Sequence, residues 1–317
     1  MQNTPKEWSM IEKIRFRVQR QNKHNIVPLG DDAFVFKNYP GYSVICQDMM
    51  VENVHFNLKY TSAFDLGFKA LAVNLSDIAA MGAQPHYAQV SLALPPNLNE
   101  SWLDDFYQGM AQLADDWRTE VVGGDLAASP DKVVVDVSVH GSCEYPITRK
   151  GARPGDLLMS SGPLGLSFTG LTALQKNLPG FESAKEKHLR PRPRLDLVKG
   201  LQTHHARVHA LMDCSDGLIN DAMQLTPPGG GFHIFAENLP VHTESQQMAL
   251  ELGMPVSDFA LWGGEDYELL MAISPDDYDH FSGWHMVGQF TEKPGVFLTF
   301  AKGQEEITDF KGWRHFK

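Results

Sequence analysis

The clearest pattern of apolar and polar positions lies in residues 70–85. Its apolar residues recur at the spacing of an α-helix: Leu71, Ala72, Leu75, Ile78 and Ala79. Gly82 and Pro85 are typical of a helix end, so we expect a buried helix that stops there. Asn74 and Asp77 are three residues apart and share a face. A carboxylate in so apolar a helix costs stability unless it is paired or binds a metal. Asp77 is therefore either a cap for a neighbouring loop or a ligand.

The rest of the first half predicts short strands between helices. Helices are expected over residues 7–21 and 101–117, the second with Ser101 as N-cap and Asp104 at the capping-box position. Strands are expected over residues 42–46, 88–94, 121–125 and 133–140. The first of these strands leads into Asp48, and the third ends in a double glycine followed by Asp125. Paired glycines make turns, and they also let a backbone approach a ligand closely.

A basic, turn-rich connector over residues 148–156 marks the expected domain boundary, which gives domains 1–145 and 146–317. Beyond it we expect strands over 156–160, 208–212 and 232–236, and helices ending at Leu174 and over 218–225 and 243–252. No tandem repeat is visible. Because each half mixes helices with antiparallel-looking hairpins, the fold class expected is α+β in both domains rather than a doubly wound sheet.

Composition and charge narrow the class of protein. The chain has 317 residues, 43% of them hydrophobic and 21% charged, which is typical of a globular protein with two domains. It has no apolar run long enough for a membrane helix, and its first residues lack the apolar core of a signal peptide. Three widely spaced cysteines argue against a disulfide framework or zinc ribbon and fit a reducing cytoplasm. A net charge of −12 disfavours binding to nucleic acid.

Carboxylates are the candidate chemistry. Asp31, Asp48, Asp77, Asp125 and Asp213 each stand at an expected strand end, glycine turn or helix break. Oxygen ligands without nearby Cys or His pairs favour Mg²⁺ over zinc. Several Mg²⁺ ions on such a cluster can bind polyphosphate, which is half of phosphoryl-transfer chemistry. Direct cationic partners for phosphate could come from the basic stretches 148–156 and 190–194, which could equally be solvated surface. Neither a Walker motif nor a protein-kinase catalytic loop is present.

Several motifs, in order and over nearly the whole chain, resemble the thiamine-monophosphate kinase family. They are Gly30-Asp31-Asp32-Ala33, Asp48 with residues 51–56, and the segments 69–83, 122–125, 149–156, 213–218 and 263–269. The resemblance implies the fold of the aminoimidazole ribonucleotide synthetase superfamily. In that fold the N-terminal domains form a barrel at a dimer interface, and a C-terminal α/β domain packs alongside.

The resemblance also implies an activity: ATP plus thiamine monophosphate gives ADP plus thiamine diphosphate, in a cytoplasmic homodimer. Carried over by motif, the Mg²⁺ ligands would be Asp31, Asp48, Asp77, Asp125, Asp213 and Asp216. ATP would contact Tyr107, Gly124, Asp125, Arg149 and Ser215. Thiamine phosphate would contact His55, Glu265 and Trp313, and an indole face suits a cationic thiazolium. Asp77, Asp125 and Asp213 would be the catalytic carboxylates.

Two departures from the family pattern concern metal positions. Cys46-Gln47 stand where the family usually has Ser/Thr-Thr before Asp48, and Leu126 stands where it has Thr. Cys and Leu are poor Mg²⁺ ligands, so at least one metal position is expected to be altered, weakened or completed by water. Two alternatives stay open. One is a superfamily sibling that uses ATP to activate an amide or carbamoyl oxygen, and the other is a non-catalytic protein that binds thiamine phosphate or a nucleotide.

Overall fold

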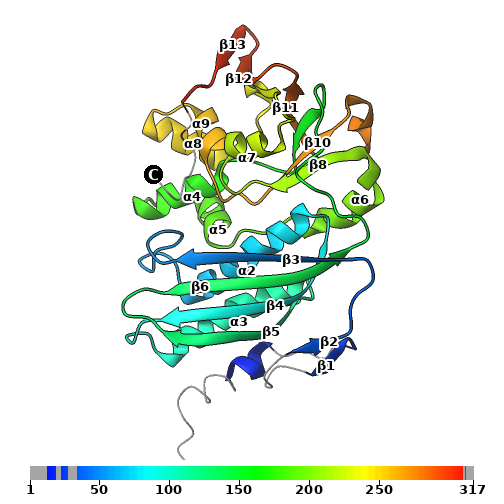
Figure 1. Ribbon diagram of the computed structural model, residues 1–317. Helices are drawn as coiled ribbons and strands as arrows, with labels where there is room; N and C mark the ends of the chain where they lie inside the picture. The colour runs from blue at the N-terminus through cyan, green and yellow to red at the C-terminus, as the bar shows by residue number, and fades with distance from the viewer. Residues whose placement is uncertain (1–12, 19–22, 28–33, 310, 312–317) are drawn as a thin grey trace, which may run out of the picture. The chain divides into compact units, whose positions relative to one another are not determined.

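The computed structural model describes residues 13–18, 23–27, 34–309 and 311 (Figure 1). The chain divides into two compact units: Met1–Ile78 with Ala83–Glu144, called here the first unit, and Ala79–Gly82 with Tyr145–Lys317, the second unit. None of the described helices has the length and apolar character needed to span a membrane.

The first unit is a four-stranded sheet with two helices on one face (Figure 1). Its strands, in spatial order, are β3 (Tyr42–Val51), β6 (Val134–Cys143), β4 (Gln84–Leu94) and β5 (Glu120–Ala128). The pairs are antiparallel except for β4 with β5, which is parallel. Alternate residues of β6, such as Val135 and Val137, are buried, as its period-two pattern predicts. A separate ribbon joins β1 (Asn25–Val27) to β2 (Val35–Phe36).

The two helices of the first unit, α2 (Ala63–Ala80) and α3 (Glu100–Asp116), meet at glycines. A Cβ on Gly67 of α2 would lie 1.8 Å from the Phe106 carbonyl oxygen, and one on Gly109 of α3 would lie 1.9 Å from the Phe64 carbonyl oxygen. No side chain fits at either place, so the helix backbones are in close contact. The apolar residues expected on α2 are fully buried, which confirms the predicted helix.

Helix boundaries in the first unit differ from expectation because the caps lie elsewhere. Helix α2 begins at Ala63, well before residue 70, and the Ser62 hydroxyl accepts from the Asp65 N–H at 3.1 Å. The N-cap of α3 is Asn99 rather than Ser101, and its side-chain oxygen accepts from the Trp102 N–H at 2.9 Å. Instead of completing a capping box, Asp104 pairs with an arginine.

Strands β3 and β5 run further than expected. Gln47 and Asp48 lie within β3 rather than after it, and β5 continues past the expected end at Asp125 to Ala128. A Cβ on Gly124 would be 1.9 Å from the Val90 carbonyl oxygen of β4. The glycine therefore lets one strand run close to the next, whereas the sequence left a turn and a close approach to a ligand as the alternatives.

The second unit is built on a seven-stranded sheet. Its spatial order is β13 (Gly303–Glu306), β12 (Gly295–Phe300), β9 (Gly231–Phe235), β11 (His285–Thr291), β7 (Leu157–Ser160), β10 (Leu269–Ile273) and β8 (Val208–Asp213). Only β12 with β9 is parallel among these pairs. The mixed sheets of both units, with helices, confirm the α+β class at this level.

The helices of the second unit include two whose bounds match the sequence prediction, α7 (Leu218–Leu225) and α8 (Thr243–Leu252). The others are α4 (Leu166–Gln175), α5 (Glu182–Leu189), α6 (Val198–Thr203) and α9 (Val256–Trp262). Short 3₁₀ turns are η1 (Leu195–Leu197), η2 (His205–Arg207), η3 (Ala236–Asn238) and η4 (Pro275–His280). One apolar core lies on the sheet, and a second joins α4, α5, α8 and α9.

Candidate functional site

The predicted carboxylates of the first unit stand on three different elements. Asp48 is half-buried on β3, Asp77 is half-buried on α2, and Asp125 is exposed on β5, where its side chain accepts from the Leu126 N–H at 3.0 Å. Burial raises the pKa of Asp48, and the nearby Asp136 carboxylate raises it further. Asp31 lies outside the described residues.

The residues that depart from the family pattern have partners inside the first unit. The Cys46 thiol lies 3.3 Å from the Asn74 carbonyl oxygen of α2. The Gln47 amide donates to Asp136 Oδ2 at 2.6 Å. Successive side chains of a strand point to opposite faces, so Cys46 serves the contact with the helix and Gln47 holds a second carboxylate on the other face. The sequence analysis did not identify Asp136 as a site candidate, because the alternating residues around it predict only a strand.

His55 lies in the irregular segment that follows β3. The Val51 N–H donates to His55 Nδ1 at 3.0 Å. Because Nδ1 accepts this bond, the neutral ring carries its proton on Nε2. The Glu52 carboxylate fixes the same segment by accepting from the Val133 N–H at 3.0 Å. The segment therefore presents His55 as an Nε2–H donor, which suits an anionic ligand.

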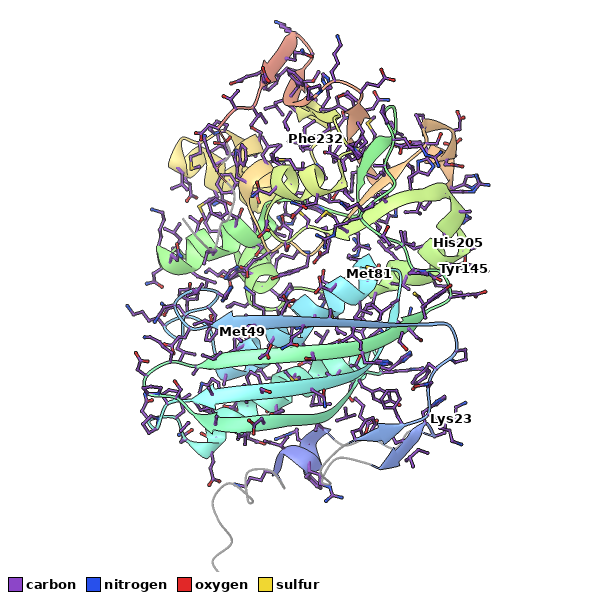
Figure 2. All side chains as sticks on the ribbon, in the orientation of Figure 1. Lys23, Met49, Met81, Tyr145, His205 and Phe232 are labelled. Carbon is purple, nitrogen blue, oxygen red and sulfur yellow. The ribbon has the colours of Figure 1, made fainter. Side chains whose placement is uncertain are left out.

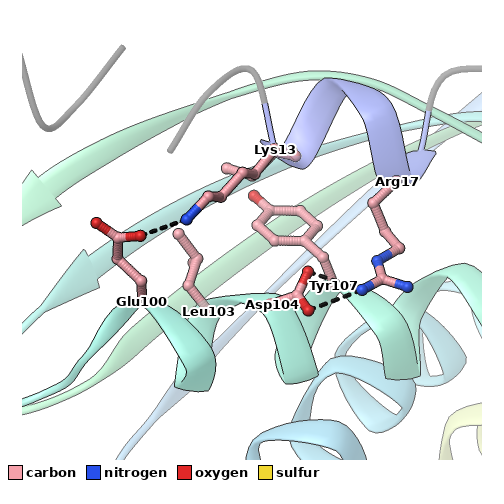
Figure 3. A pocket seen from close by; sticks show the side chains of 7 residues that line it. Lys13, Arg17, Glu100, Leu103, Asp104 and Tyr107 are labelled. Carbon is pink, nitrogen blue, oxygen red and sulfur yellow. Dashed lines mark hydrogen bonds and ion pairs between the residues drawn. The ribbon is translucent and has the colours of Figure 1, made fainter. Parts of the chain in front are cut away.

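Tyr107 is buried on α3, and burial raises the pKa of its hydroxyl. It lines a small pocket beneath the helical residues 13–18, as Figure 3 shows. Arg17 pairs with Asp104 at 2.7 Å, and Lys13 pairs with Glu100, so two ion pairs hold these residues against α3. The contact between Tyr107 and ATP that the resemblance implies stays a prediction.

In the second unit, the predicted motif at the end of β8 forms the loop into α7. Asp213 is buried at the strand end, while Ser215 and Asp216 are half-buried. The Asp216 N–H donates to the Asp221 carboxylate at 3.0 Å. Burial, followed by the charges of Asp213 and Asp216, raises the pKa of Asp221 to about 8. Asp221 forms a cluster of three carboxylates with Asp213 and Asp216. The sequence analysis missed it, although its place in the first turn of α7, four residues after Gly217, could have identified it.

Arg149 is anchored beside β8 by its neighbours. The Thr148 carbonyl oxygen accepts from the Leu211 N–H of β8 at 2.9 Å, and Arg149 itself is exposed. Upstream, the rings of Tyr145 and His205 stack with their centroids 3.7 Å apart (Figure 2). These contacts fix the start of the second unit and leave the guanidinium accessible to a ligand.

The segment 263–268 is fastened to the β8–α7 loop. The Glu265 N–H donates to the Ser215 carbonyl oxygen at 2.7 Å, and the Tyr267 N–H donates to the Cys214 carbonyl oxygen at 2.9 Å. Glu265 and Tyr267 have φ values of 63° and 51°, in the left-handed region that costs a residue with a side chain. A Cβ on Gly264 would lie 2.6 Å from the Ser215 carbonyl oxygen, so this double glycine permits a close approach of two backbones.

The other two acids of this segment are structural. Asp266 caps α4 by accepting from the Gly165 and Ser167 N–H groups at 2.5 and 3.0 Å. Glu268 accepts from Lys187 at 2.6 Å and from Arg194 at 2.7 Å. Arg194, which the sequence offered as a phosphate partner or as solvated surface, is thus engaged in an internal ion pair.

The donors fit Mg²⁺ in kind. Within residues 13–18, 23–27, 34–309 and 311, no group of three or more His, Cys, Asp or Glu side chains is arranged to hold a metal by itself. The carboxylates of Asp213, Asp216 and Asp221, however, lie close enough to raise a pKa, and Asp136 Oδ1 is buried with no hydrogen-bond partner among the described atoms. A bound cation would offset both the repulsion among these carboxylates and the burial of the unpartnered Asp136 oxygen. Oxygen-only donors suit a hard ion such as Mg²⁺.

Comparison with protein families matches both halves of the chain. Residues 30–143 match the N-terminal domain of AIR synthase related proteins, and residues 153–300 match the C-terminal domain of the same proteins. Thiamine-monophosphate kinase of Aquifex aeolicus is 35% identical over 293 residues, covering 91% of this chain and 92% of the relative. The chain belongs to the thiamine-monophosphate kinase family. The Bacillus subtilis member of this family is 34% identical and covers 98% of this chain and 99% of its own.

Solved structures of thiamine-monophosphate kinases share the fold. AaThiL complexed with AMPPCP and TMP has a TM-score of 0.79 at 35% identity, covering 86% of this chain and 87% of the other. Thiamine-monophosphate kinase from Stenotrophomonas maltophilia K279a has a TM-score of 0.81 at 30% identity, covering 92% of this chain and 96% of the other. Hydrogenase maturation protein HypE in complex with ATP, at 16% identity and a TM-score of 0.77, shares the fold alone.

Proposed function

We propose that this protein transfers the γ-phosphoryl group of ATP to thiamine monophosphate, which forms thiamine diphosphate and ADP. Similarity to thiamine-monophosphate kinases over more than nine tenths of both chains carries the proposal. The relative solved with AMPPCP and TMP supports both substrates. The candidate residues of both units add carboxylates for metal ions, an exposed arginine and an imidazole donor.

Mg²⁺ ions would be held by Asp31, Asp48, Asp77, Asp125, Asp213 and Asp216. When bound, the ions neutralise charge on the phosphates of both substrates. Gln47 and Cys46 supply no hydroxyl ligand, and the Gln47 amide instead binds the Asp136 carboxylate on the opposite face of β3 from Cys46. We therefore expect a metal position altered in its ligands rather than lost.

Beyond charge neutralisation by the metal ions, the rate enhancement would come from positioning the two substrates. The second pKa of a phosphate monoester is about 6, so the acceptor phosphate is mostly dianionic near neutral pH and needs no general base. The Nε2–H of His55 would donate to the substrate phosphate, and Arg149 and Ser215 would contact ATP. Glu265 and Trp313 would contact the thiamine part of the substrate, with Trp313 outside the described residues. Holding both substrates in line lowers the entropic part of the barrier.

We further propose a cytoplasmic homodimer with the N-terminal domains, residues 1–145, paired in a barrel that contributes ATP and metal ligands. Residues 146–317 would complete the ATP and substrate site. The support comes from the sheet face opposite α2 and α3, which exposes Ile45 and Met49 at 72% and 56%. Large apolar side chains gathered on one sheet face are typical of an interface.

The Asp77→Asn variant tests the metal role at the centre of this proposal. The change removes a ligand charge from a helix whose packing residues stay the same, so we expect turnover to be abolished while the thermal midpoint measured in EDTA changes little. Asp131→Asn, at an exposed position between β5 and β6, is the charge-matched control and should retain activity. Near-normal activity of Asp77→Asn would remove the metal role assigned to Asp77.

A further inference from the structure

His188 is a buried imidazole that none of the roles above uses. It lies near the end of α5, and its side chain is only 4% exposed. Its Nδ1 atom lies 3.1 Å from the Ser167 hydroxyl of α4 and 3.4 Å from Glu265 Oε2. A single ring atom thus faces both the start of α4 and the carboxylate assigned to thiamine phosphate.

Glu265 presents two sides to its surroundings. Its side chain is 28% exposed, and its Oε2 atom lies 3.4 Å from His188 Nδ1. Its backbone is fixed by the bond to the Ser215 carbonyl oxygen and by the buried cap that the next residue, Asp266, gives to α4. The backbone is therefore set by neighbours, whereas the direction of the long side chain depends on what its carboxylate contacts.

The position of His188 is itself rigid. A Cβ on Gly170 of α4 would lie 2.0 Å from the Ala184 carbonyl oxygen and 3.0 Å from His188 Cβ, so α4 and α5 touch through their backbones. The preceding residue, Lys187, is tied to Glu268 at 2.6 Å. Both sides of the contact between His188 and Glu265 are thus anchored to one framework of helices and the segment 263–268.

We propose that His188 is a positioning residue that orients the Glu265 carboxylate toward the amino-bearing, cationic thiamine part of the substrate. The inference rests on the proposed function, since it takes Glu265 as the substrate contact. When Nδ1 carries the proton, it faces both Glu265 Oε2 and Ser167 Oγ as a donor, because a carboxylate can only accept. The contact at 3.4 Å limits the rotamers of Glu265 before substrate arrives, so binding costs less side-chain entropy.

Direct binding of thiamine monophosphate, measured by calorimetry, tests this role independently of turnover. In His188→Ala the dissociation constant for thiamine monophosphate should rise about 10-fold, as expected for loss of a polar contact to a charged group. The dissociation constant for an ATP analogue should stay within about 2-fold of the unchanged protein. His188→Asn, whose side-chain N–H lies near the position of Nδ1, should recover most of the affinity.

A double-mutant cycle separates positioning from general packing. If His188 acts through Glu265, His188→Ala should add little to the loss already caused by Glu265→Gln. His233→Ala is the matched control, because His233 also lies near a hydroxyl, Thr299 Oγ1 at 3.0 Å, and should leave both affinities unchanged.

Equal losses for both ligands, or fully additive effects in the cycle, would overturn the positioning role. If His188→Ala does not fold, the same comparison is made with His188→Asn and His188→Gln. The glutamine amide lies nearer the position of Nε2, so only asparagine should keep the affinity, and equal affinities of the two variants would overturn the proposal. If the unchanged protein binds thiamine monophosphate but forms no thiamine diphosphate, the proposed reaction fails while the test of His188 still stands.

Discussion

At the scale of single residues, His86 shows how burial sets a charge. Its ring stacks on Tyr39 with centroids 3.6 Å apart, and Nε2 lies 2.7 Å from the Ser142 hydroxyl. Burial, followed by the neighbouring His140 and His24, lowers the pKa of His86 to about 4. The folded protein therefore keeps this imidazole neutral over a range in which an exposed histidine becomes charged.

The free energy of unfolding should consequently fall as pH drops through this range. Between the ordinary histidine pKa of about 6.5 and the folded value of about 4, the unfolded chain binds more protons than the folded one. Denaturant titrations in this window should show that His86→Phe flattens the pH dependence, although it loses the bond to Ser142. An unchanged slope in His86→Phe would mean that other groups cause the acid sensitivity.

The site residues whose positions could be predicted from sequence are those that stand in a recognisable local pattern of strands, turns and helices. Asp213 follows a strand and precedes a helix, so its place at a strand end could be predicted and is confirmed. Asp136 and His188 gain their importance from partners 89 and 77 positions away, Gln47 and Glu265. No local pattern contains such contacts, which arise only when strands and helices pack.

At the scale of elements, glycine decides how closely neighbours approach. Helix prediction found α7 and α8 with their bounds, because apolar periodicity and turn residues agree there. Strand prediction ended β3 and β5 too early, because polar residues and glycines are typical of strand ends although both strands continue. A glycine required by a neighbouring backbone, such as Gly124, looks the same in sequence as a turn glycine.

The contact between α2 and α3 gives a prediction at this scale. Gly67→Ala places a methyl group where Cβ would be 1.8 Å from a carbonyl oxygen, so the helices must separate. We expect a loss of about 2 kcal/mol or more in the free energy of unfolding, measured by urea denaturation. Gly200→Ala is the control, because nothing lies within 4 Å of its Cβ in α6, and it should stabilise slightly. Similar effects of both changes would argue against close helix contact.

At the scale of the whole molecule, the proposed dimer depends on the exposed face of the four-stranded sheet. Ile45→Lys places a charge on that face without touching the helix side of the sheet. Sedimentation velocity should then show a monomer, because burying an unpaired charge is costly. Leu250→Lys, on an 85% exposed position of the second unit, is the control and should leave the association state unchanged. A dimer that persists in Ile45→Lys would place the interface elsewhere.

The central claim, phosphorylation of thiamine monophosphate, is tested most directly by identifying the product of one reaction. The protein is incubated with ATP, Mg²⁺ and thiamine monophosphate, and the thiamine compounds are separated and measured with ADP. We predict thiamine diphosphate and ADP in equal amounts, and neither when EDTA removes the metal. ADP formed only with another acceptor would indicate the superfamily sibling. Binding of thiamine monophosphate without ADP would indicate a non-catalytic protein, and either result would contradict the proposed function.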